Sequence, residues 1–318
     1  MALEAESPDA IQHATGFFDA LGRSLFYQQW TAAHGDTPLI IVHGGGDHSG
    51  RHLETAKRLV RAGYAVHALD LPGHGRSPGK RGHIRYFDEY VASVRAFVQK
   101  VSGQYAGQKP ILLGHSLGGL ISTFYVIKHQ ETIRCLILSS PLWGFNFRVP
   151  LWKRILADCL LPVWPSLTMD RPRVGEDVLS HDPRVTVLYR SDPLVHPKAS
   201  VRLYAELQRK FKELPLVLPQ LKVPTLILKA GADRVASPKA VEQLFPCVGS
   251  TQKKLIMYDG YYHEVLHEVD KERVFQDMVM WLQTVRVSRA EELPLGDLTP
   301  QPPIGPPRST PGTEPSDR

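Results

Sequence analysis

The sequence has few cysteines and no long apolar run. Its 318 residues include three cysteines, Cys135, Cys159 and Cys247, whose spacings match neither a disulfide framework nor a metal site. Because proteins of reducing compartments use cysteine in this way, we expect a cytoplasmic protein. No stretch approaches the roughly 20 apolar residues that a membrane-spanning helix needs. Residues 1–14 are polar and acidic, so we expect no signal peptide.

An excess of charge of one sign is also lacking. The 38 Lys and Arg residues are scattered among 32 Asp and Glu residues, and they leave a net charge of +6. They form no basic block and no mixture of basic and aromatic residues of the kind that binds nucleic acid, so we expect no nucleic-acid partner. The positive balance allows at most a weak attraction to anionic lipid surfaces. No sequence feature specifies an oligomeric state.

What the sequence does contain is a regular alternation of aliphatic runs and helical segments. Residues 16–31 alternate apolar and polar side chains about a turn, which predicts an antiparallel hairpin that opens the sheet. Strands are then predicted at residues 39–42, 64–69, 111–113, 134–141, 224–229 and 254–258. Helices are predicted between and after them at residues 51–62, 87–101, 117–126, 239–245 and 264–285. This order predicts an α/β fold with a mainly parallel sheet.

The alternation is interrupted at residues 142–214. This segment is apolar, aromatic and rich in proline, and it holds three of the five tryptophans, Trp143, Trp152 and Trp164. It is predicted to be a cap over the carboxyl edge of the sheet, or alternatively a helical subdomain with a small core of its own. We therefore divide the chain into a core (1–141), a cap (142–214), a second part of the core (215–286) and a disordered proline-rich tail (287–318).

The segment Gly114-His115-Ser116-Leu117-Gly118 lies where a buried strand meets a helix. Glycines on both sides of a serine allow the sharp turn of a nucleophile elbow, because side chains there would collide. Such a turn holds the serine hydroxyl at the N-terminus of the following helix, where unpaired N–H groups favour an oxyanion. Ser116 is therefore the predicted nucleophile.

A serine nucleophile needs a base and a carboxylate that orients the base. On this kind of fold the acid and then the histidine follow the serine, each in a loop after a strand. Asp233 follows the strand at 224–229 and His263 follows the strand at 254–258, so they are the predicted partners. Asp70 and Asp259 are the rival acids. His43, His74 and His115 adjoin glycine turns, where ring-to-backbone hydrogen bonds are the better interpretation.

Two further motifs have competing interpretations. The glycines at 44–46 predict one oxyanion donor, the N–H of Gly45, which would act with the N–H of Leu117; the alternative, a phosphate loop, lacks the Gly-Lys-Ser/Thr that should follow. His263-Glu264-Val265-Leu266-His267 matches the zinc motif H-E-x-x-H. That motif requires both histidines on one face of a regular helix, whereas His263 follows a strand and a turn. We expect no metal and no cofactor.

Six stretches together resemble the monoacylglycerol lipase and lysophospholipase branch of the α/β-hydrolases, also classed as serine aminopeptidase S33-like. They are His43-Gly44-Gly45-Gly46-Asp47-His48-Ser49-Gly50-Arg51, Asp70-Leu71-Pro72-Gly73-His74-Gly75-Arg76-Ser77, Gly114-His115-Ser116-Leu117-Gly118, Ser191-Asp192-Pro193-Leu194, Gly231-Ala232-Asp233-Arg234 and Tyr261-Tyr262-His263-Glu264. The resemblance covers about residues 15–285. It implies an α/β-hydrolase fold, with a mainly parallel eight-stranded sheet flanked by helices and a helical cap insertion. It also implies the triad Ser116, Asp233 and His263 and the oxyanion donors Gly45 and Leu117.

The resemblance further implies polar contacts from Asp47, Arg51 and Tyr189 to the alcohol part of a substrate. The match is weaker here, because Asp47 stands where a glutamate is usual and Leu266 where a histidine can occur. A helix cap and ion pair is the alternative role for Asp47 and Arg51.

The expected function is that of a serine esterase that cleaves single-chain lipid esters, such as monoacylglycerols or lysophospholipids, through an acyl-enzyme. The aromatic cap is expected to receive the acyl chain and to touch membrane surfaces transiently. The alternatives are a general carboxylesterase, another α/β-hydrolase of small soluble substrates, and a non-catalytic binding protein that retains the fold.

Overall fold

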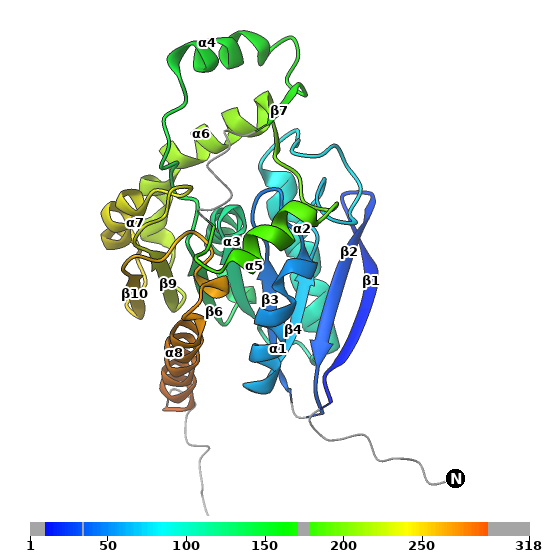
Figure 1. Cartoon of the computed structure of the whole chain (residues 1–318). Helices are drawn as coiled ribbons and strands as arrows, with labels where there is room; N and C mark the ends of the chain where they lie inside the picture. The colour runs from blue at the N-terminus through cyan, green and yellow to red at the C-terminus, as the bar shows by residue number, and fades with distance from the viewer. Residues whose placement is uncertain (1–9, 34, 171–178, 292–318) are drawn as a thin grey trace, which may run out of the picture.

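The structure is a computed structural model that describes residues 10–33, 35–170 and 179–291. Its centre is an eight-stranded sheet with the order β1-β2-β4-β3-β5-β6-β9-β10 (Figure 1). The strands are β1 (Gln12–Ala20), β2 (Arg23–Thr31), β3 (Thr37–Val42), β4 (Tyr64–Leu69), β5 (Ile111–His115), β6 (Cys135–Ser139), β9 (Thr225–Ala230) and β10 (Lys253–Tyr258). The predicted α/β fold with a mainly parallel eight-stranded sheet is confirmed.

The predicted hairpin forms one edge of the sheet. Strand β1 pairs antiparallel with β2, which pairs antiparallel with β4. The strands β4, β3, β5, β6, β9 and β10 then pair in parallel. Since parallel strands end at a common edge, the loops that follow β3, β5, β9 and β10 are brought together there.

Helices cover both faces of the sheet, and the strand residues alternate between two cores. Helices α2 (Asp88–Gln104), α3 (Leu117–Lys128) and α7 (Pro238–Leu244) pack on one face, and α1 (Leu53–Arg61) and α8 (Lys271–Glu291) on the other. In β3, Ile40 and Val42 enter the first core, while Leu39 and Ile41 enter the second. Burial on both faces explains why residues 39–42 of this strand are all aliphatic.

The segment between β6 and β9 lies above the sheet, with α4 and α6 uppermost in Figure 1. It contains α4 (Leu151–Leu160), β7 (Thr168–Asp170), α5 (Pro183–Ser191), β8 (Lys198–Ser200) and α6 (Val201–Val217). The antiparallel pair β7–β8 was not predicted from the sequence. Helix α6 also continues past residue 214, where the predicted cap ends.

The last predicted helix begins later than expected. A 3-10 turn, η6 (Val265–His267), precedes α8, which starts at Lys271 and not at residue 264. Side chains of this segment bond elsewhere: Glu264 binds Arg51, and Glu268 accepts the N–H of Tyr262. These bonds favour an irregular backbone over a helix. Helix α8 extends to Glu291, into the predicted tail, and the rest of the tail lies outside the described residues.

No helix of the described residues is long and apolar enough to cross a membrane.

Candidate active site

Ser116 occupies a strained turn between β5 and α3. Its φ of 52° and ψ of −117° are unusual for a residue with a side chain. The turn depends on its glycines. A Cβ on Gly114 would lie 2.6 Å from the Gly118 carbonyl oxygen, and one on Gly118 would lie 2.1 Å from the Val42 carbonyl oxygen. The steric reason for both glycines, inferred from the sequence, therefore applies in the structure.

Three predicted residues from distant loops lie within hydrogen-bonding distance of one another. The Ser116 hydroxyl is 2.9 Å from His263 Nε2, and His263 Nδ1 is 2.7 Å from Asp233 Oδ2. A carboxylate can only accept, so Nδ1–H donates to Asp233 and Nε2 is left to accept the serine proton. All three side chains are buried. This is the arrangement that a serine nucleophile and its base require.

The Asp233 carboxylate is held in place by its own loop. Its second oxygen, Oδ1, accepts the N–H groups of Val235 (2.8 Å) and Ala236 (2.9 Å). The rival acids lie elsewhere. Asp70 is buried and accepts the backbone N–H groups of Ser49 and Arg76, whereas Asp259 is exposed in a turn. Asp233 is the one of these three acids that bonds His263.

The two predicted oxyanion donors line the same cavity as Ser116. Leu117 is the first residue of α3, so its N–H has no acceptor within the helix. Among the described residues, neither this N–H nor that of Gly45 donates a hydrogen bond to another group. The glycine loop also lies close to the nucleophile, since a Cβ on Gly44 would be 3.3 Å from Ser116 Cβ. The oxyanion role of Gly45 and Leu117 stays a prediction.

Three other histidines near the site bond to the backbone, as predicted. His43 Nδ1 contacts the Gly44 carbonyl oxygen at 2.8 Å, and His74 Nδ1 contacts that of Pro72 at 3.0 Å. His115 Nδ1 lies 3.2 Å from the Ser139 carbonyl oxygen. Burial lowers the pKa of His43 and brings the pKa of His115 well below its usual value, so both rings are neutral at pH 7.

The residues that were predicted to contact the substrate alcohol are already engaged with one another. Arg51 donates to Asp47 Oδ1 (3.2 Å) and to both oxygens of Glu264 (3.0 and 2.9 Å). Its guanidinium carbon lies 4.8 Å from the centre of the Tyr189 ring. Of the alternative role, the ion pair is observed, but Asp47 is not the cap: it accepts the N–H of the adjacent His48, and the N-cap of the next turn is His48, whose ring accepts the N–H of Gly50. Since Asp47, Arg51 and Tyr189 all line the cavity, contact with a substrate stays a prediction.

Glu264 belongs to this group and was missed. From the sequence it was noted in the zinc motif and in the family stretch at residues 261–264, but no contact with Arg51 was predicted. In the structure its carboxylate binds Arg51 and also accepts from His267 Nδ1 at 2.9 Å. His263 precedes the 3-10 turn and bonds Asp233, so the two histidines of the motif do not share a helix. The available sequence signal was that Glu264, a charged residue, directly follows the predicted base His263, which places its side chain near the site.

The cavity over Ser116 has a volume of about 260 Å³. Its apolar lining comes mainly from the cap segment, and it includes Phe145, Phe147, Val149, Ala157, Leu203 and Leu207. The three tryptophans are not part of the lining. Trp143 is buried and donates to Thr123 Oγ1 at 3.3 Å, while Trp152 and Trp164 are exposed. The aromatic residues of the segment are therefore divided among the cavity lining, the buried core and the exposed surface.

The cap segment is attached to the loops that carry the site. His196 N donates to the Gly46 carbonyl oxygen at 3.0 Å, and Glu264 N donates to that of Leu179 at 2.8 Å. His48 Nε2 also donates to Asp192 Oδ2 at 2.8 Å. Both the glycine loop and the histidine loop are thus bonded to residues 142–214, whose role as a cap stays a prediction.

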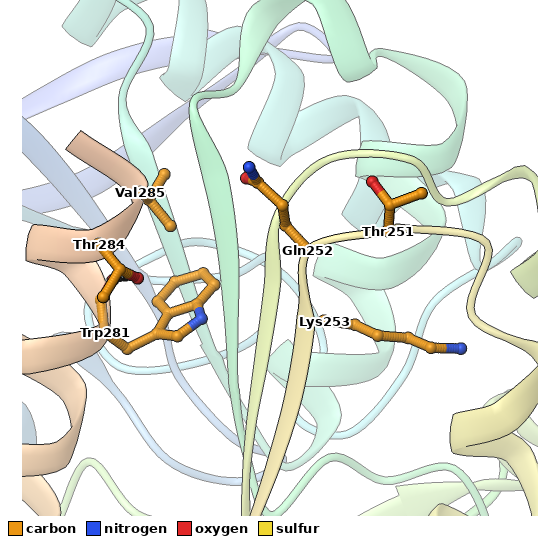
Figure 2. Close-up of a pocket in the computed structure, with 6 residues that line it drawn as sticks. All are labelled: Thr251, Gln252, Lys253, Trp281, Thr284 and Val285. Carbon is orange, nitrogen blue, oxygen red and sulfur yellow. Dashed lines mark hydrogen bonds between the residues drawn. The ribbon is translucent and has the colours of Figure 1, made fainter. Parts of the chain in front are cut away.

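A second hollow, of about 240 Å³, lies between the start of β10 and α8. Figure 2 shows the side chains that line it: Thr251, Gln252, Lys253, Trp281, Thr284 and Val285. They include no histidine or carboxylate, so they offer no base for a nucleophile. The hollow lies at the amino end of β10, the opposite end from His263. The cavity over Ser116 is therefore the candidate active site.

Comparison with known proteins identifies the family of this chain. The family model described as serine aminopeptidase, S33, matches residues 34–270. A monoacylglycerol lipase of Mycolicibacterium smegmatis is 31% identical over 269 residues, which are 82% of this chain and 93% of the relative. Phospholipase YtpA of Bacillus subtilis is 33% identical over 251 residues, 78% and 95% of the two chains. The crystal structure of a Paleococcus ferrophilus monoacylglycerol lipase has a TM-score of 0.72 and 28% identity, and the match covers 87% of this chain and 99% of that one.

Proposed function

The chain belongs to the serine aminopeptidase S33 family of α/β-hydrolases and is a serine hydrolase, and from this we propose that it cleaves the carboxylic esters of single-chain lipids at Ser116. One observation carries the assignment to this serine: the hydrogen bonds that join Ser116 to His263 and His263 to Asp233 at the floor of a largely apolar cavity. The relatives named monoacylglycerol lipase and phospholipase support a lipid ester as the substrate.

In the proposed reaction, His263 Nε2 takes the hydroxyl proton as Ser116 Oγ attacks the ester carbonyl carbon. The N–H groups of Gly45 and Leu117 would stabilise the negative oxygen of the tetrahedral intermediate. His263 then returns its proton to the leaving alcohol, and the acyl group stays on Ser116. A water molecule, deprotonated by the same imidazole, releases the fatty acid and restores the serine. Asp233 holds the tautomer of His263 that both steps use.

Labelling by a fluorophosphonate probe, together with turnover of a panel of esters, tests this proposal. We expect the wild type to be labelled, Ser116→Ala to remain unlabelled, and long-chain monoacylglycerols to be better substrates than short soluble esters. A preference for short esters would favour the alternative, a general carboxylesterase. Equal labelling of wild type and Ser116→Ala, or none of either, would favour a binding protein. Loss of activity with EDTA would instead support the zinc interpretation.

We further propose that the cap segment touches membrane surfaces transiently. Helix α4 exposes apolar side chains, with Leu151 67%, Trp152 62% and Ile155 54% exposed, and it carries Lys153 and Arg154 beside them. An apolar surface with basic neighbours suits the interface of an anionic bilayer. Co-sedimentation with anionic and neutral vesicles tests this. Trp152→Ser with Ile155→Ser should reduce binding, whereas equal binding by wild type and double variant would contradict the proposal.

We also propose residence in the cytoplasm. Cys135, Cys159 and Cys247 are free thiols, which suits a reducing compartment. Fractionation of cells that make the protein tests this, and recovery outside the cytoplasmic fraction would contradict it.

A further inference from the structure

The cavity over Ser116 has an apolar wall and a charged wall. The apolar wall comes from the segment 142–157 and from α6. The charged wall comes from Asp47, Arg51 and Glu264, with the Tyr189 ring against the guanidinium. Glu264 directly follows His263, whose ring contacts the Ser116 hydroxyl. If the proposed function is right, the acyl chain lies along the apolar wall, and the leaving alcohol faces the charged wall.

All three members of the charged wall are ionised at neutral pH. Burial alone would raise the pKa of Asp47 and Glu264, but the Arg51 guanidinium between them lowers both pKa values below the ordinary range. Burial would lower the pKa of Arg51, and the two carboxylates raise it instead. Two negative charges and one positive charge are therefore buried together. The wall carries one negative charge in excess.

Two neighbouring imidazoles are hydrogen-bonded to the carboxylates of the charged wall. His52 Nε2 donates to Asp47 Oδ2 at 3.1 Å, and His267 Nδ1 donates to Glu264 Oε2 at 2.9 Å. The opposite nitrogens of both rings are buried and meet no hydrogen-bond partner among the described residues.

Two lysines also line the cavity, but both belong to the cap segment. Lys153 on α4 lies 5.3 Å from the Trp152 ring, and Lys198 on β8 is the cross-strand partner of Asp170. Within the described part of the chain, neither forms an ion pair with Asp47 or Glu264.

We propose that Glu264 is a specificity-determining residue that makes the alcohol side of the cavity accept uncharged polyols and reject phosphate monoesters. Glu264 supplies the carboxylate in excess over Arg51, and a like charge in a buried site is repelled. It also occupies both terminal nitrogens of Arg51, which would otherwise bind a phosphate in the two-pronged geometry typical of arginine. The substrate class is then the ester of a neutral alcohol such as glycerol, and not an acylglycerol phosphate.

The first test compares kcat/KM for a monoacylglycerol and for the acylglycerol phosphate with the same acyl chain. The wild type should strongly favour the neutral ester. Glu264→Gln should lower this preference by on the order of tenfold or more, because it removes one charge from the wall. Glu272→Gln, which alters an exposed glutamate paired with Arg58 on the surface, should leave the preference unchanged. Equal use of both esters by the wild type, or an unchanged preference in folded Glu264→Gln, would overturn the inference.

The second test measures binding, and so it needs neither turnover nor a variant. An alkyl glycerol ether and its phosphate monoester, which the enzyme cannot hydrolyse, are compared by calorimetry on the wild type. We expect the neutral ether to bind more tightly. Equal binding of the ether and its phosphate would refute the selection by charge but would leave the proposed hydrolase function standing. Selective binding by a protein that no fluorophosphonate labels would refute the proposed hydrolase and leave the selection standing.

Discussion

At the scale of single residues, the triad of Ser116, His263 and Asp233 leads to the most specific prediction, which concerns kcat. Asp233→Asn should lower kcat by about 10,000-fold, because an amide cannot hold the His263 tautomer that accepts the serine proton. Steady-state kinetics, with circular dichroism to verify folding, measure the effect. The triple variant Ser116→Ala, His263→Ala, Asp233→Asn should have a kcat only slightly below that of Ser116→Ala alone, since the three residues act as a unit. A nearly normal kcat in Asp233→Asn would show that Asp233 is not the acid of the triad.

A second residue-scale prediction concerns the stability that Arg51 provides. Arg51→Ala leaves the carboxylates of Asp47 and Glu264 buried without their cation, and it should lower the free energy of unfolding by about 3–5 kcal/mol. Urea denaturation measures this. Lys57→Ala breaks an exposed pair with Glu54 and is the control, with an expected loss below about 1 kcal/mol. Equal losses in both variants would mean that burial of the cluster is energetically unimportant.

At the scale of elements, the junction of β5 and α3 is limited by close packing against β3. Gly118→Ala places a methyl group 2.1 Å from the Val42 carbonyl oxygen, so the backbone must move. We expect a loss of stability of at least about 2 kcal/mol, together with slower labelling of Ser116. Gly103→Ala on α2 is a matched control, because no atom lies within 4 Å of the added Cβ. It should be neutral or stabilising by up to about 1 kcal/mol.

Helix α4 offers a test of where the acyl chain lies. Ala157 lines the cavity from this helix, whereas its neighbour Leu156 does not line it and is 41% exposed. Ala157→Phe should lower kcat/KM for long-chain esters by about tenfold or more and spare short-chain esters, because the ring fills space that a long chain needs. Leu156→Phe should change neither. Equal effects of Ala157→Phe on both chain lengths would place the acyl chain elsewhere.

At the scale of the whole molecule, the buried carboxylates predict how stability depends on pH. The folded protein holds the pKa of Asp47 and Glu264 below their ordinary values of 3.8 and 4.5. Their contribution to stability is therefore complete above about pH 5 and is lost as the pH falls further, because the unfolded chain binds the protons first. Urea midpoints between pH 7 and pH 3 measure the loss. The double variant Asp47→Asn, Glu264→Gln should show a shallower decline than the wild type, and an identical decline would contradict the assignment.

Much of the fold could be predicted because its signals are local. The aliphatic run in β3 and the alternation of β1 and β2 follow from which faces of each strand are buried. The last helix was predicted too early, because side-chain bonds to residues far along the chain compete with the helix before Lys271. The β7–β8 pair was missed, since strands of three residues carry almost no periodic signal.

The sequence by itself determined the order of strands and helices, the glycines that the Ser116 turn requires, and the places of Asp233 and His263 after their strands. Each depends on sterics or periodicity over a few neighbouring residues. Only the tertiary structure decided that Arg51 lies between Asp47 and Glu264, that His48 meets Asp192, and which of the aromatic residues face the cavity. A buried charge is stable only beside an opposite charge, and Glu264 lies 213 positions from Arg51. No local pattern records that pairing, because it arises when the folded sheet brings two loops to the same edge.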